Sequence, residues 1–95
     1  IMPGDPASTS FTSRYAGLLW RDLMAGQADF AVDLHTQSTG TLYPAYVFAD
    51  VRNPVIARMA EMLRPDMIKI DSGDQGILET TLSANGIPAV TYELG

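Results

Sequence analysis

The chain contains no cysteine and only one histidine. Without cysteine, neither a disulfide framework nor a thiolate metal site can form. Positive charge is also sparse, because six Lys and Arg residues stand against 11 Asp and Glu residues and leave a net charge of −5. Phosphate binding needs a concentrated basic face, and these six residues are scattered along the chain. The composition therefore argues against nucleic acid and against an anionic membrane surface as partners.

Long hydrophobic runs are missing too, although 46% of the residues are hydrophobic. A membrane span needs about 20 consecutive apolar residues, and no basic, then apolar, then small-residue signal pattern opens the chain. A length of 95 residues at this composition is typical of one small globular domain. We therefore expect a single domain over residues 1–95 with a cytoplasmic location.

The first half of the chain predicts a helix followed by two strands. Residues Ser8 to Ser10 can cap a helix that ends near Gly26, and apolar residues recur in it at four-residue spacing: Phe11, Tyr15, Leu19 and Leu23. This spacing predicts an apolar face packed on a sheet. The apolar first half of residues 28–40 predicts a buried strand, and the run from Tyr43 to Ala49 predicts a second one.

The second half alternates helices and strands. Asn53-Pro54 predicts a helix start, Arg64-Pro65 ends that helix, and residues 67–70 form a short strand. A third helix is expected from about residue 77 to the Asn85-Gly86 terminator, before a last strand over residues 87–92. We interpret residues 71–76 as an ordinary solvated turn.

Together these elements predict an α/β fold, a three-layer sandwich with a mixed, mostly parallel sheet of about four strands and three helices. The gap between the first two strands is too short for a helical crossover. That pair is therefore expected to run antiparallel.

The first candidate site residues lie at the end of the first predicted strand. Asp33 and His35 lie two residues apart, so their side chains point to the same side of a strand. His35 is a candidate metal ligand or general base, and Asp33 a second ligand or outer-shell partner. The structural alternatives are a hydrogen-bonded, partly buried histidine and a carboxylate that caps a neighbouring loop.

Glu93 follows four apolar or β-branched residues at the end of the last strand. Such a position is typical of a carboxylate held in a partly dry site, where it can act as a general base. The alternative is a solvated carboxylate. A zinc site needs about three protein ligands, and a chain with one histidine and no cysteine does not complete one by itself.

Three blocks of the sequence resemble the succinylglutamate desuccinylase/aspartoacylase family, which shares its fold with the zinc carboxypeptidases. They are Met2-Pro3-Gly4-Asp5, residues 28–36 with Gly40, and residues 86–95. The resemblance implies a Zn²⁺ cofactor, with His35 as the final zinc ligand. It also implies that Glu93 is the general base that moves a proton from water to the departing amine. The implied substrate is a small N-acylated amino acid.

Other features of that family are missing from this chain. It has no His-x-x-Glu pair for the other two zinc ligands and no Asn-Arg pair before the Pro-Gly turn. We therefore expect an internal fragment, the central portion of the catalytic domain, which is inactive in isolation. A homo-oligomer through surface exposed by truncation is a further expectation.

The residues that would bind the substrate also differ from those of aspartoacylases. Leu82 stands where they carry an arginine for the substrate carboxylate, which favours a succinyl or similar acyl group over N-acetylaspartate. We expect Asp33, Thr36 and Tyr43 to be second-shell or substrate residues. Tyr46 and the loop over residues 36–41 are further candidates for the acyl side. Two alternatives stay open: a zinc carboxypeptidase acting on peptides, and a metal-free α/β binding domain that kept the fold.

Overall fold

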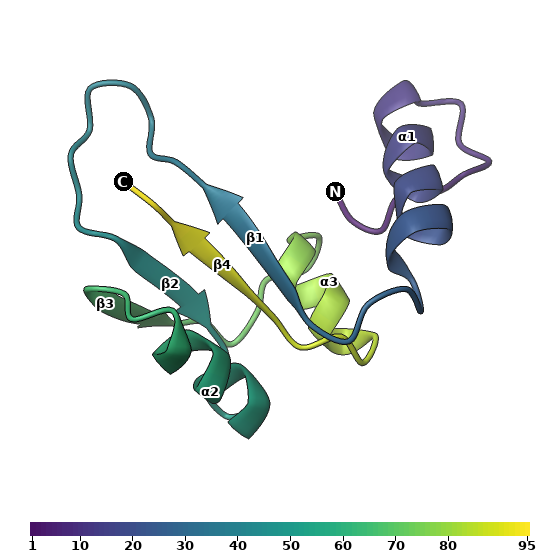
Figure 1. Cartoon of the computed structure of the whole chain (residues 1–95). Helices are drawn as coiled ribbons and strands as arrows, with labels where there is room; N and C mark the ends of the chain where they lie inside the picture. Colours follow the sequence, from purple (N-terminus) through teal and green to yellow (C-terminus); the bar gives the residue numbers. More distant parts are fainter.

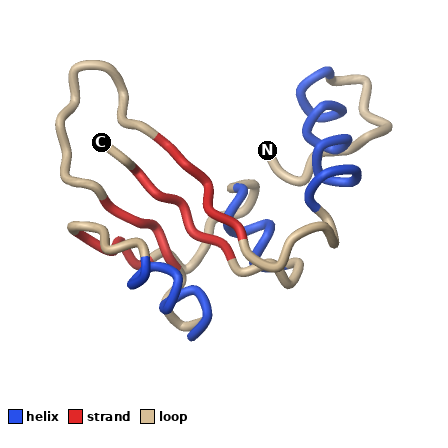
Figure 2. Tube along the Cα trace, in the orientation of Figure 1, coloured by secondary structure: helices blue, strands red, loops and turns tan.

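Four strands form one sheet in a computed structural model that describes all residues 1–95 (Figure 1). They are β1 (Ala31–His35), β2 (Tyr46–Ala49), β3 (Met67–Ile70) and β4 (Ala89–Glu93), in the spatial order β1-β4-β2-β3. β1 pairs with β4 and β2 with β3 in parallel, whereas β2 and β4 are antiparallel. The predicted mixed, mostly parallel sheet is confirmed. β1 and β2 run in opposite directions as expected, but they do not pair, because β4 lies between them (Figure 2).

Helices pack on both faces of this sheet, which gives the three predicted layers. On one face α2 (Pro54–Met62) closes a core of Val47, Ala49, Ile56, Ala60 and Val90. On the other face α3 (Leu78–Ala84) contributes Leu82 to a smaller cluster with Ile87 and Ala89. Because successive strand residues point to opposite faces, Ala89 and Val90 of β4 enter different cores.

The ends of α2 and α3 follow the local signals in the sequence. Asn53 Oδ1 accepts hydrogen bonds from the backbone N–H groups of Val55 at 2.9 Å and Ile56 at 3.4 Å, with Pro54 in the first helical position. Gly86 follows α3 with a φ of +82°, a left-handed conformation that favours glycine. No helix in the structure is both long and apolar enough to cross a membrane.

The prediction for the first helix is wrong in its packing. α1 (Phe11–Leu19) continues into a π-helical turn, η1 (Trp20–Met24), at the expected place in the chain. However, Phe11, Tyr15 and Leu23 are all more than half exposed, and α1 stands to one side of the sheet (Figure 1). Only Trp20 and Met24 at its end pack against the core beside α3. The sheet face opposite α2 is covered by α3 instead.

The prediction of a buried first strand is also wrong. β1 lies at the edge of the sheet, where Val32 is 43% and Leu34 63% exposed. The reason is topological: β4 takes the position between β1 and β2, and α2 packs over β2 and β4. An apolar run predicts a strand, but it does not determine which strands become central.

Candidate functional site

The parallel register of β1 and β4 places His35 directly opposite Glu93 at the carboxyl ends of both strands. The His35 Nδ1 atom lies 3.4 Å from Glu93 Oε1, and the Nε2 atom lies 2.9 Å from Asp33 Oδ2. The structure therefore brings three of the predicted site residues together, with Asp33 and His35 on the same side of their strand as expected.

The Glu93 carboxylate is held in a partly dry position. Its side chain is 12% exposed, and its Oε2 atom accepts a hydrogen bond from Gln37 Nε2 at 3.2 Å. The same Gln37 amide donates to the Tyr46 hydroxyl at 2.9 Å. Tyr46 is the register partner of Glu93 on β2. Gln37 and Tyr46 belong to the residues that the sequence suggested for the acyl side, but the contact of Gln37 with Glu93 was not predicted, because it depends on the path of the loop after β1.

Thr36 and Tyr43 do not join this constellation. Thr36 is exposed just beyond the end of β1. Tyr43 is 55% exposed and lines a separate hollow with Gln37, Tyr46 and residues of β3. Both belong to the long loop between β1 and β2, which extends beyond the sheet (Figure 1). Their predicted roles at the acyl side of the site therefore lack a contact with His35 or Glu93 here.

His35 and Glu93 open into a cavity of about 280 Å³. Its sheet wall includes Thr91, Phe48 and Lys69, which are register partners across β4, β2 and β3. The opposite wall comes from the segment after β3 and from α3, with the side chains of Asp71, Asp74, Ile77 and Glu79. The cavity thus joins the predicted strand-end residues to carboxyl groups that sequence reasoning did not assign to the site.

Glu79 is the main residue that the sequence did not reveal. It is only 6% exposed, and its pKa is raised from an ordinary 4.5 to about 8. Burial is the largest cause; the contact with the Asp71 carboxyl and the charges of Asp71 and Asp33 contribute in the same direction, while the Thr91 backbone N–H lowers the pKa. Near neutral pH the Glu79 side chain is therefore mostly a neutral acid. A glutamate in the first turn of a helix is otherwise typical of a solvated face.

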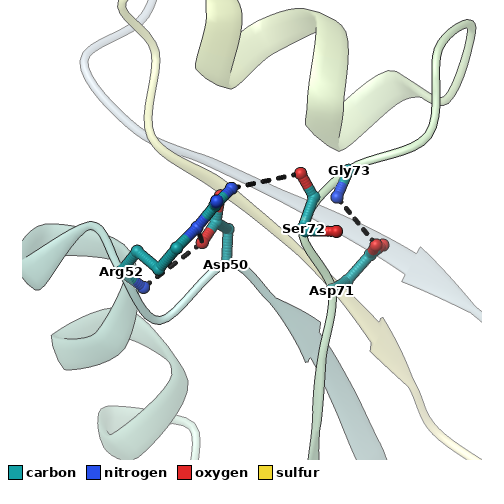
Figure 3. Close-up of polar contacts among 5 residues, drawn as sticks. All are labelled: Asp50, Arg52, Asp71, Ser72 and Gly73. Atoms are coloured by element: carbon teal, nitrogen blue, oxygen red, sulfur yellow. Dashed lines mark hydrogen bonds and ion pairs between the residues drawn. The ribbon is translucent and has the colours of Figure 1, made fainter.

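Asp71 reaches this cavity because of the turn that follows β3. The Gly73 N–H donates to Asp71 Oδ1 at 2.9 Å, and Gly73 has a φ of +96°, which only glycine adopts easily (Figure 3). Arg52 pairs with Asp50 at 2.8 Å and donates to the Ser72 carbonyl at 3.4 Å. Residues 71–76 are indeed a loop, but the interpretation as an ordinary solvated turn is wrong for Asp71, whose carboxyl lies against that of Glu79.

The zinc ion that the resemblance implies needs several protein ligands, which can be compared with the side chains at this site. His35 fits as one ligand, since a carboxylate on one ring nitrogen is the usual way to orient a metal-binding imidazole. The second ring nitrogen faces Glu93, and no group of three or more His, Asp and Glu side chains is placed to hold an ion. The residues present therefore do not complete a metal site, and no chemical step is assigned to a metal here.

In comparisons with protein-family models, curated proteins and solved structures, none matches this chain. The resemblance to the succinylglutamate desuccinylase/aspartoacylase family consequently rests on the sequence blocks alone.

Proposed function

We propose that this chain carries the general-base half of a zinc-dependent amide hydrolase. Its reaction would remove an acyl group, succinyl or similar, from an N-acyl amino acid. The observation that carries the proposal is the pairing of His35 with Glu93, 3.4 Å apart at the ends of adjacent parallel strands. A metal-binding imidazole beside a partly buried carboxylate is the pair that hydrolysis of this kind requires.

In this proposal Glu93 moves the proton. Its carboxylate takes a proton from the water that attacks the acyl carbon, and it returns that proton to the amine nitrogen as the C–N bond breaks. Gln37 and His35 contact different oxygens of Glu93 and fix the orientation of the carboxylate. The ligands that complete the metal site would come from residues outside these 95, as the resemblance implies.

A second candidate, a metal-free binding domain, is favoured by one specific observation. Both ring nitrogens of His35 face carboxylates, Asp33 at 2.9 Å and Glu93 at 3.4 Å. In that arrangement the Nε2 atom hydrogen-bonds with Asp33 and the Nδ1 atom lies at ion-pair distance from Glu93, so neither nitrogen is free for a metal.

Zinc binding measured by calorimetry separates the two candidates. Because one histidine does not complete a zinc site, the hydrolase proposal expects at most weak binding by this chain, and that binding should fall at least ~10-fold in His35→Ala. The matched control is Glu61→Gln, which removes a charge from an exposed position on α2 and should leave binding unchanged. Zinc binding that is unaffected by His35→Ala would overturn the hydrolase proposal and favour the binding domain.

Hydrolysis of N-succinyl and N-acetyl amino acids is assayed on the same samples with zinc present. We expect background rates, because the donor set is incomplete. Turnover that disappears in Glu93→Gln would support the role of Glu93 and show that the chain completes its own metal site. Turnover that Glu93→Gln leaves intact would exclude Glu93 as the general base.

A further inference from the structure

One edge of β1 has no partner strand. β1 lies at the end of the sheet and pairs only with β4, toward which the Ala31 N–H donates to the Pro88 carbonyl at 3.0 Å. The backbone groups of alternate strand residues point to opposite edges, so those of Val32 and Leu34 point away from β4. Such an open row of N–H and C=O groups is a template for pairing with another strand.

The side chains beside this open edge are apolar. Phe30 and Val32 line a groove of about 750 Å³ together with Met59 and Met62 of α2. Because α2 packs over β2 and β4, the side chains of β1 on this face stay uncovered, and Phe30 and Met62 are both more than half exposed. The one charged residue of the lining is Arg58, which pairs with an acid of α2 itself. The groove and the open edge therefore form one continuous surface.

The two edges of the sheet differ in how they are protected. Edge strands of monomeric proteins are normally blocked by lysine, by proline or by a covering segment. β3, at the far edge, has Lys69 within its four residues, whereas β1 contains neither lysine nor proline. The β1 edge is therefore the one that favours pairing with another chain.

We propose that two copies of this chain pair through β1, antiparallel about a two-fold axis at Val32. In this register Val32 lies opposite Val32 of the second copy, and Phe30, just before β1, lies opposite Leu34. All three residues direct their backbone groups outward, so each pair exchanges two hydrogen bonds. Opposite residues share a face of the sheet, which places both α2 helices on one side and joins the two apolar grooves. Such an interface is self-complementary, as a two-fold dimer requires.

Neighbouring registers fit less well. An axis at Asp33 places two carboxylates directly opposite each other, which is destabilising. An axis at Leu34 places Val32 opposite the polar Thr36 and so breaks the match between apolar residues. With the axis at Val32, no two like charges are directly opposite. The sequence of the edge therefore selects one register.

The size of this surface predicts a weak dimer. The strand edge and the exposed apolar side chains would bury on the order of 600 Å² per copy, whereas stable interfaces bury about 800 Å² per partner. We expect a dissociation constant between ~10 µM and ~1 mM. The pairing needs neither zinc nor a substrate, so its failure is distinguishable from failure of the hydrolase proposal.

Sedimentation equilibrium of the 95-residue chain over this concentration range tests the proposal. We expect a monomer–dimer equilibrium that Val32→Lys weakens at least ~10-fold, because two ammonium groups then lie opposite each other at the axis. Val32 is 43% exposed, so the lysine remains in solvent in the monomer. The matched control is Ile70→Lys on β3, a position that is 70% exposed, which should dimerise like the unmodified chain.

Amide hydrogen exchange of the unmodified chain tests the register without any substitution. The Val32 and Leu34 N–H groups should exchange more slowly as the protein concentration rises, because only the dimer bonds them. The Asp33 N–H points toward β4 and should be protected at every concentration. A chain that stays monomeric, a dimer that survives Val32→Lys, or an equal loss in Ile70→Lys would overturn the proposal. So would protection that rises with concentration only at β3 or α1.

Discussion

The two faces of the sheet differ in the side chains that their strands present. On the α2 face, Val47, Ala49 and Val90 are fully buried against Ile56 and Ala60. On the α3 face, β1 and β4 present polar groups, among them Asp33, His35, Thr91 and Glu93. The apolar side chains on that face include the cluster near Ala89 and the ring of Phe48. The α2 face therefore supplies most of the stability, and the α3 face holds the chemistry.

This comparison shows what strand periodicity can do in a small domain. A shift of one residue in β4 would exchange its two faces and move Glu93 to the side of the sheet that packs against α2. The apolar residues of the α2 face therefore fix the register that aligns His35 with Glu93. The packing of β4 against α2 on one face therefore also determines the position of Glu93 relative to His35 on the other face.

The largest change in the free energy of unfolding should come from a substitution on the α2 face. Ile56→Ala removes a side chain that is 2% exposed, and we expect a loss of about 2–4 kcal/mol in the free energy of unfolding, measured in urea. The control Val55→Ala alters the preceding residue, which is 41% exposed, and should cost under ~1 kcal/mol. Equal losses in both variants would show that the α2 face is not the main core.

A substitution on the α3 face should change the free energy of unfolding by an intermediate amount and in the opposite direction. The folded chain holds a proton on Glu79 up to about pH 8, whereas the unfolded chain releases it near the ordinary value of 4.5. Between these two pH values the folded state binds more protons, so Glu79 lowers stability progressively as the pH rises through the range. Glu79→Gln should therefore add about 1–3 kcal/mol at pH 8 and almost nothing at pH 4.

Urea unfolding of both proteins from pH 4 to pH 8.5 measures this difference. Glu61→Gln is the control, since its glutamate is exposed on α2 and away from the cavity. A stability difference between Glu79→Gln and the unmodified chain that stays constant with pH would contradict the burial of Glu79 as the cause of its raised pKa.

The smallest change in stability should come from substitutions at the helix ends. Asn53→Ala removes the acceptor for two backbone N–H groups of α2 and should cost about 1 kcal/mol. At the corresponding position of α1, Ser10 makes no capping hydrogen bond with its side chain, so Ser10→Ala should cost less than Asn53→Ala. Thermal unfolding followed by circular dichroism ranks the two variants. The reverse order would mean that α1 contributes more to folding than its exposed position indicates.

Local signals in the sequence predicted those features that depend on neighbouring residues. Asn53-Pro54 and Asn85-Gly86 marked helix ends, since capping involves atoms only two to four residues apart. Strand periodicity placed Asp33 and His35 on one side for the same reason. The failures concern distant partners: the apolar stripe of the first helix indicated a buried face, yet most of that stripe is exposed and α3 packs on the sheet beside it.

The sequence by itself determined the α/β class, the order of the elements and the side on which Asp33 and His35 lie, because these follow from local periodicity and capping. Only the tertiary structure decided that β4 enters between β1 and β2, which brings Glu93 to His35 across 58 residues of sequence. The same packing buries Glu79 beside Asp71 and gives it a pKa that its helical position does not predict. Burial and the charge of a neighbour depend on groups that are distant along the chain, and a local pattern contains no information about them.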